Sequence, residues 1–299
     1  MKFIKRTCLF LISCVICAFS FINKTVEQNK SLVLNAKRPI VTIWVHGTKL
    51  TPTIVLKRFF YRIPGMHKAS AYDIQYHKRT IVDLLCKTDA NNYQFENFYI
   101  FGWNGKLCFN QRKCAAQELY DSVQEIIKEH TNILGVPPFI RIITHSHGGN
   151  VALNLAKIQK KKNPIVIDEL ILLACPVQHK TKKLIQNDCF KKVYAFYSAG
   201  DMFQVIDPQG WYKKGKSNRT FSERRFEHHK KLRQARIKIN GRPLMHIDFI
   251  WTNFLQHLPL LCNTIDTYYQ TIAPDQLHMT KQLDIRTKLN PIIIDKKLL

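Results

Sequence analysis

A serine in a turn rich in histidine and glycine is the first residue of this sequence that could do chemistry. Ser146 lies in the run HSHGG, directly after residues 139–144 (FIRIIT), whose β-branched residues predict a buried strand. A serine hydroxyl is a weak nucleophile that needs a general base, and a tight strand-to-helix turn lifts it above a sheet. Such a turn requires small residues two positions before and after the serine. Gly148 meets this need, and Thr144 takes the earlier position.

Candidate partners of Ser146 stand at the ends of other predicted strands. The segment His46–Thr48 follows one strand, Trp103 ends another, Asp201 follows a third, and His246 comes after the last. In an open parallel sheet, sites form beyond the carboxyl ends of the strands. The sequence therefore predicts that a nucleophile, an acid and a base meet at one edge of a sheet.

The elements that must position these residues alternate along the chain. Hydrophobic patterning predicts strands at residues 39–45, 95–103, 139–144, 168–174, 192–198 and about 235–240. It predicts helices near 53–62 and 76–87, over 114–130 and 150–160, and up to about 257. Strands that alternate with helices form a mostly parallel central sheet with crossover helices on both faces, so the predicted fold class is α/β.

Residues 39–258 resemble an α/β-hydrolase of the lipase/esterase type, a fold in which serine, acid and histidine follow in that chain order. The resemblance rests on four segments, which are HGT at 46–48, THSHG at 144–148, AGD at 199–201, and His246. It implies a catalytic triad. In that triad Ser146 is the nucleophile, His246 is the general base and then the acid, and Asp201 orients the imidazole.

The resemblance also implies roles for residues around the triad. The backbone N–H groups of Thr48 and His147 would form the oxyanion hole. His46–Gly47 and Trp103 would line the substrate site, although buried aromatic packing is the favoured interpretation of Trp103. Thr144 departs from the Gly-x-Ser-x-Gly pattern at its first glycine. Some lipase-like families carry Ala, Ser or Thr there, so this departure leaves the subfamily open rather than the reaction.

Each member of the triad has an alternative interpretation. Ser146 could be a helix N-cap, and Asp201 could be a turn residue, with Asp207 and Asp168 as alternative acids. The alternative bases are His257 and the pair His228–His229.

The histidines beside the serine also permit a metal-dependent hydrolase. His145 and His147 form a His-x-His pattern at a strand end. Gly149 and Asn150 occupy the places where further ligands would follow, and two histidines are too few for a catalytic zinc site. The pattern is therefore a weak metal signal, and we expect no metal ion and no organic cofactor.

The N-terminal residues predict an export signal or a membrane anchor. A short basic head precedes the mostly apolar stretch 7–22, which is shorter than the about 20 residues of a membrane span. Ala18 and Ser20 fit a cleavage after residue 20. Residues 1–20 are therefore expected to be a signal peptide or an anchor, which makes the protein periplasmic, secreted or membrane-anchored.

Cysteine usage leaves the redox state open. Three of the nine cysteines lie in the leader, and the other six could pair after export or remain as buried thiols. Cys108 and Cys114 are the closest two of the six.

The charge of the chain calls for an anionic partner. The chain holds 46 Lys and Arg against 21 Asp and Glu, a net charge of +25. Twelve of these cations, against two Glu, lie at 213–242, in a predicted basic insertion at 211–242. The insertion could be a solvated loop, or a surface for an anionic membrane, for which a basic amphipathic helix near 221–237 would serve. Nucleic acid is the least favoured partner, because no recognised binding motif accompanies the charge.

These observations favour a serine hydrolase that cleaves carboxylic esters, of lipid-like substrates, through an acyl-Ser146 intermediate. A thioesterase or acyltransferase could use the same triad. A catalytically silent protein of this fold that binds a membrane or partner through 211–242 is the alternative from another class. Residues 259–299 form an extension for which the sequence predicts no structure, and the oligomeric state is not predicted.

Overall fold

The computed structural model describes most of the chain. The described residues are 38–48, 63–159, 164–206, 222–271, 281–285 and 292–295. The predicted leader at 1–20, the helix near 53–62 and the alternative acid Asp207 lie outside these residues.

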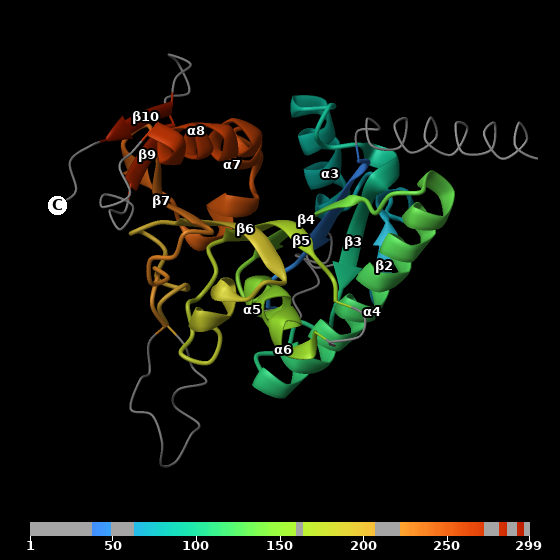
Figure 1. Cartoon of the computed structure of the whole chain (residues 1–299). Coiled ribbons are helices and arrows are strands. Elements are labelled where there is room, and N and C mark those ends of the chain that lie inside the picture. The colour runs from blue at the N-terminus through green and yellow to red at the C-terminus, as the bar shows by residue number, and fades with distance from the viewer. Residues whose placement is uncertain are drawn as a thin grey trace, which may run out of the picture.

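One mixed sheet runs through the described part of the molecule (Figure 1). Its strand order is β2-β3-β1-β4-β5-β6-β7-β9-β10, and β8 pairs with β7. The pairs from β3 to β9 are parallel, whereas β2, β8 and β10 are antiparallel to their neighbours. The strands are β1 Ile40–Val45, β2 Gly65–Lys68, β3 Phe98–Gly102, β4 Phe139–His145, β5 Ile167–Leu173, β6 Phe190–Tyr197, β7 Leu232–Ile239, β8 Arg242–Pro243, β9 Lys281–Ile285 and β10 Ile292–Asp295.

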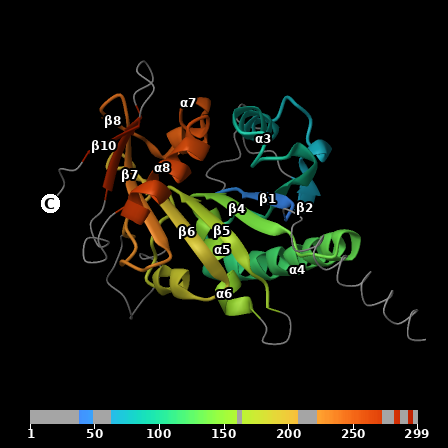
Figure 2. The same ribbon diagram turned by 45° about the horizontal axis from the view of Figure 1, so that its top comes forward.

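Helices cover both faces of this sheet. Figure 2 shows α4, α5 and α6 on one face and α3, α7 and α8 on the other. The α-helices are α3 His77–Thr88, α4 Phe109–Leu134, α5 Gly148–Leu153, α6 Leu155–Ile158, α7 Thr252–Leu255 and α8 Leu258–Thr271. Short 3-10 helices span Ala69–Ala71, Phe95–Asn97, Lys182–Gln186 and His246–Ile250.

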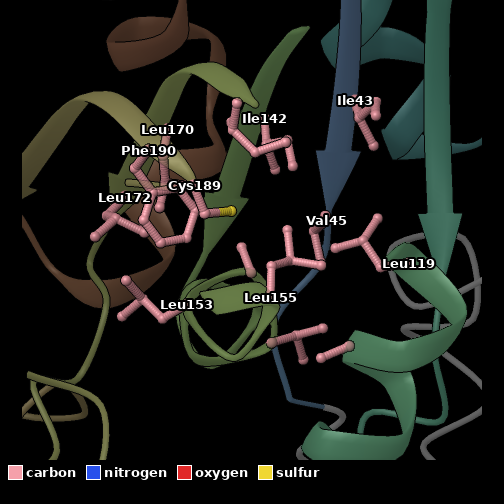
Figure 3. Close-up of a cluster of buried hydrophobic side chains, with 14 of the residues drawn as sticks. Ile43, Val45, Leu119, Ile142, Leu153, Leu155, Leu170, Leu172, Cys189 and Phe190 are labelled. Atoms are coloured by element: carbon pink, nitrogen blue, oxygen red, sulfur yellow. The ribbon is translucent and has the colours of Figure 1, made fainter. Parts of the chain in front are cut away.

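Alternating side chains of the central strands fill two hydrophobic cores. In β1, Ile43 and Val45 face the core under α4 and α5, whereas Trp44 faces the core under α3 and α8. Figure 3 shows the first of these cores, in which Val45 and Ile142 of the sheet lie near Leu119 of α4. Burial on both faces explains why β1 is apolar along its whole length.

The predicted α/β class and its mostly parallel sheet with helices on both faces are confirmed. One helix is broken where the sequence predicts a continuous one over 150–160. The break falls at Asn154, between α5 and α6, where the Asn154 amide donates to the Asn150 carbonyl oxygen at 2.7 Å. A polar side chain that bonds to the backbone of the preceding turn competes with regular helix geometry.

The prediction of a basic amphipathic helix near 221–237 is wrong for its described residues. Residues 232–239 form β7, which pairs in parallel with β6. Ala235 and Ile237 are buried in the core under α8, so tertiary packing overrides any local helical tendency. The extension at 259–299 contributes most of α8 and, through β9, a strand that pairs in parallel with β7.

Candidate active site

Ser146 occupies a strained turn directly after β4. Its φ angle is 54°, in the left-handed region that L-residues other than glycine rarely adopt. Two backbone hydrogen bonds hold the turn. The Ser146 N–H donates to the Leu173 carbonyl oxygen at 2.9 Å, and the Ser146 carbonyl accepts from the Gly149 N–H at 3.0 Å. Strain that the surrounding structure maintains in this way is typical of functional sites.

Close backbone packing explains the two glycines nearest to the serine in space. A Cβ atom on Gly148 would lie 2.5 Å from the Val45 carbonyl oxygen and 2.6 Å from that of His46. A Cβ atom on Gly47 would lie 2.8 Å from the Cβ of Ser146. The end of β1 and the start of α5 therefore meet at the turn with no room for side chains, and the segment His46–Thr48 passes directly against Ser146.

Thr144 fits in the turn because its polar atom has a partner. Its side chain is fully buried, and its hydroxyl donates to the Ile171 carbonyl oxygen of the neighbouring strand β5 at 3.2 Å. A buried hydroxyl with a hydrogen bond carries little penalty. The departure from glycine at this position is thus compatible with the turn.

Replacing Gly148 with alanine is expected to destabilise the fold and to abolish any activity of Ser146. The added methyl group would overlap two carbonyl oxygens, and overpacking of this kind costs about 3 kcal/mol of unfolding free energy. Gly135→Ala is the matched control, since Gly135 has φ 73° and open space around it. For this control, urea unfolding is expected to show a loss of about 1 kcal/mol of unfolding free energy. Equal losses in the two variants would contradict the packing argument.

Asp201 and His246 form a hydrogen-bonded pair beside this turn. The His246 Nδ1 lies 2.7 Å from Oδ2 of Asp201, whose side chain is fully buried. The other carboxylate oxygen accepts from the Gln204 N–H at 2.9 Å. Because a carboxylate is an acceptor, Nδ1 carries the proton and Nε2 keeps its lone pair. The imidazole is therefore held in the tautomer that a general base needs.

The ring of His246 lies beside the residue that precedes Ser146. The rings of His145 and His246 are 4.7 Å apart between centroids, and Nε2 of His145 donates to the His246 carbonyl oxygen at 2.9 Å. The structure thus brings together three segments: the turn after β4, the loop after β6 and the segment after β8. The strand order of the mostly parallel sheet and the strained turn after β4 identify the fold type. The chain has an α/β-hydrolase fold.

Comparison with known proteins adds distant structural neighbours. No family model and no curated protein sequence matches this chain. Among solved structures, phospholipase PlaB from Legionella pneumophila in complex with thio-NAD aligns with 19% identity and a TM-score of 0.29, over 46% of this chain and 25% of that one. One of two fungal esterases from Rhizomucor miehei aligns with 11% identity and a TM-score of 0.41, over 79% and 76%. Carboxyl esterase 2 from Tuber melanosporum aligns with 12% identity and a TM-score of 0.36, over 83% of this chain and 67% of that one.

The structural similarities to these three proteins are low. All three TM-scores lie below 0.5, and this chain spans only a quarter of the length of the phospholipase. The strand order and the turn at Ser146 carry the assignment instead.

His46 and Trp103 bind each other in this hydrolase fold. Nδ1 of His46 donates to the Gly47 carbonyl oxygen at 2.7 Å, and the Trp103 indole N–H donates to the His46 carbonyl oxygen at 2.8 Å. Trp103 is buried, and its ring stacks on that of His46. These contacts join the ends of β1 and β3. Trp103 thus packs against His46, and a substrate role for His46, Gly47 and Trp103 stays a prediction.

Two backbone N–H groups near Ser146 have no partner among the residues that the structure describes. Thr48 and His147 donate no backbone hydrogen bond within those ranges. His147 precedes the first turn of α5, where backbone N–H groups lack intrahelical acceptors. The predicted oxyanion hole would use these two groups.

The alternative acid Asp168 and base His257 have other contacts. Asp168 lies near the start of β5, at the opposite edge of the sheet, and pairs with Arg38 at 3.0 Å and with Lys191 at 2.8 Å. His257 lies 3.3 Å from the Gln256 amide. Neither residue is in contact with Asp201 or His246 in the described structure.

Both histidines of the His-x-His pattern are engaged with protein groups. Nε2 of His145 bonds to the His246 carbonyl, and Nδ1 of His147 accepts from the Asn150 amide at 3.3 Å. Burial lowers the pKa of His145 to about 3 and that of His147 well below its usual value. No three His, Cys, Asp or Glu side chains gather as a metal-ligand cluster within the described ranges.

Sequence reasoning missed two groups that position the acid and the base. His145 holds the backbone of His246, as described above. Arg224 donates from Nη2 to the Asp201 carbonyl oxygen at 3.0 Å and to that of Ala199 at 3.3 Å. Position directly before the serine was a signal for His145, whereas nothing in the local sequence singles out Arg224.

Two features of the described structure concern its cysteines and its helices. The six cysteines outside the leader are free thiols. Across the described residues, no helix has both the length and the apolar character needed to span a bilayer.

The buried histidines predict a loss of stability in acid. The unfolded chain binds a proton at His145 below a pKa of about 6.5, whereas the folded chain does so only near 3. A fall in pH from 6.5 toward 3 therefore favours the unfolded state, by up to about 1.4 kcal/mol per pH unit. The free energy of unfolding is measured by urea unfolding at pH 7, 6, 5 and 4. In His145→Gln this free energy is expected to fall less steeply with falling pH than in the wild type. His179→Gln is the control, because His179 is exposed. If its free energy of unfolding depends on pH as weakly as that of His145→Gln, the acid sensitivity does not come from His145.

Proposed function

We propose that this protein is a serine hydrolase that cleaves carboxylic esters through an acyl-Ser146 intermediate. The observation that carries the proposal is the 2.7 Å bond between Asp201 and His246, set beside a serine whose φ angle is 54°. A buried carboxylate, a tautomer-locked imidazole and a strained serine turn have a common use in acyl transfer.

Each described group has a step in the proposed reaction. Nε2 of His246 takes the proton of the Ser146 hydroxyl as its oxygen attacks the ester carbonyl carbon. The carbonyl oxygen becomes an oxyanion, which the N–H groups of Thr48 and His147 stabilise. His246 then returns the proton to the leaving alcohol. Water, activated by the same imidazole, cleaves the acyl-serine and regenerates the hydroxyl, while Asp201 stabilises the imidazolium in both halves.

The substrate preference within this reaction is proposed to be lipid-like esters. Exposed apolar side chains flank the triad, among them Phe203, whose ring centroid lies 5.8 Å from that of His246. Two cavities in the described structure, of about 450 and 390 Å³, lie at the opposite, amino-terminal edge of the sheet and are lined partly by Lys and Arg. We therefore expect the acyl group to bind at the apolar surface beside His246.

A fluorophosphonate probe tests the proposed nucleophile. The full chain is expected to become labelled at a single serine, and peptide mapping is expected to place the label on the peptide that contains Ser146. Hydrolysis of p-nitrophenyl esters of rising chain length, beside matched thioesters and an alcohol acceptor, then separates an esterase from a thioesterase or an acyltransferase. Folded protein that takes up no label would sink the proposal and favour the catalytically silent alternative.

A further inference from the structure

Exposed apolar side chains are concentrated around the candidate acid and base. The described part of the chain has twelve large hydrophobic side chains in the exposed class. Six of them lie in two short segments, 202–206 and 245–251, that directly follow or surround Asp201 and His246. These six, here called the apolar collar, are Met202, Phe203, Ile206, Met245, Ile247 and Trp251.

The two segments form one surface. The Asp201–His246 bond joins them at 2.7 Å, and the ring of Phe203 contacts that of His246. A Cβ atom on Gly200 would lie 2.9 Å from the Leu244 carbonyl oxygen, so the two backbones also touch just before the collar begins. The two segments that carry the collar therefore lie side by side, next to the candidate acid and base.

Hydrogen bonds to the backbone fix the two segments that carry the collar. Arg224 binds the carbonyl oxygens of Ala199 and Asp201, and its Nη2 reaches the Met202 sulfur at 3.6 Å. On the other segment, the Met245 N–H donates to the Asp248 carboxylate at 2.7 Å, and the Asp248 N–H donates back to the Met245 carbonyl at 3.1 Å. Met202 and Met245 remain 55% and 62% exposed on these fixed backbones. A fixed apolar patch of this kind marks a contact with a partner or a membrane.

Charge beside the collar selects between those partners. Arg224 and Arg225 lie next to the first segment, and Arg242 comes three residues before Met245. Asp248, the acidic residue of the second segment, is engaged with the Met245 backbone. Apolar side chains in a cationic setting, with a tryptophan among them, match the interface of an anionic bilayer.

We infer that the apolar collar docks this protein onto an anionic lipid surface, with Met245, Ile247 and Phe203 inserted among the acyl chains. This inference rests on the proposed function, since docking places His246 and Ser146 at the depth of lipid ester bonds. The cationic side chains would contact the headgroups. Substrate would then reach the serine from the bilayer rather than from water.

Tryptophan quenching tests the contact at the collar itself. Vesicles of phosphatidylcholine, with or without phosphatidylserine, are made with brominated acyl chains and mixed with the full chain. Trp251 is 38% exposed, whereas Trp44 and Trp103 are buried. Part of the emission is expected to be quenched on anionic vesicles, and this part is expected to disappear in Trp251→Phe. Because the readout is local, an N-terminal leader bound to the same vesicle does not produce the Trp251→Phe difference.

A paired variant separates docking from catalysis. Met245→Ser with Ile247→Ser is expected to reduce the ratio of hydrolysis of a vesicle-borne ester to that of a short soluble ester about tenfold, since two apolar side chains lose their burial. The control is Ile133→Ser with Leu134→Ser, two exposed residues at the end of α4. The control is expected to keep the wild-type ratio.

Four outcomes would decide the inference. An unchanged ratio with no Trp251 quenching overturns docking but leaves the esterase intact if the soluble ester is still cleaved. Equal quenching on neutral and anionic vesicles overturns the anionic preference. A dimer that the paired variant dissolves, without quenching, assigns the collar to self-association and also overturns docking. Quenching with no hydrolysis of any ester supports docking and contradicts the proposed function instead.

Discussion

Ser146→Ala is expected to lower kcat for a soluble ester by a factor on the order of 10⁴ or more, because no other group can form the acyl intermediate. The fold is expected to survive. The Ser146 hydroxyl makes no hydrogen bond to another described residue, and alanine tolerates a similar backbone elsewhere in the chain, since Ala174 has φ 50°.

Steady-state kinetics and urea unfolding of the same preparation check both parts of this expectation. Ser122→Ala, a change at an α4 serine that bonds to the Glu118 carbonyl, is the control for kcat. The alanine variant at 146 is also expected to lose fluorophosphonate labelling. A kcat within tenfold of wild type in a folded Ser146→Ala chain would rule out the acyl-serine mechanism.

Asp201→Asn is expected to lower kcat by about 10⁴ with little change in KM. The amide group can still accept the hydrogen bond from the Gln204 N–H through its oxygen. Its NH₂ group would donate to Nδ1 of His246, which moves the proton to Nε2 and removes the lone pair that the proposed base needs. The loss therefore comes from the wrong tautomer rather than from a damaged fold.

The kinetic comparison that checks this prediction uses two further aspartates. Asp168→Asn removes ion pairs with Arg38 and Lys191 at the opposite edge of the sheet, so it is expected to reduce stability with kcat near wild type. Asp207 follows Asp201 in the sequence and lies outside the described residues. If Asp207→Asn is the inactive variant and Asp201→Asn retains activity, the acid has been assigned to the wrong residue.

Local sequence patterns predicted the central strands because burial on both faces leaves a continuous apolar run. Residues 39–45 and 139–144 carry such runs, and both are central strands, β1 and β4. The same logic placed Ser146, Asp201 and His246 at strand ends, and the structure sets the last two within hydrogen-bonding distance. Their catalytic roles remain predictions for the kinetic experiments above.

Patterns with weaker periodicity misled the local reading. Residues 235–237 belonged to two overlapping predictions, a helix near 221–237 and a strand at about 235–240. Pairing with β6 makes residues 232–239 the strand β7, so the strand prediction is the one that holds. In the same way, residues 281–285 become a strand because β7 offers an open edge for parallel pairing. Strand formation at an edge depends on the partner strand, which is distant in sequence.

The sequence by itself determined the strand-turn-helix around Ser146, because this unit depends on residues a few positions apart. The chain order of Ser146, Asp201 and His246 could be read from it directly. Only the tertiary structure showed what surrounds them. The carbonyl of His246 is held by His145, 101 residues earlier, and Arg224 binds the backbone of Asp201, 23 residues earlier. The apolar collar likewise exists only once two segments about 40 residues apart in sequence are joined by the Asp201–His246 bond. The net charge of +25 predicted an anionic partner, and a lipid contact at the apolar collar remains a proposal.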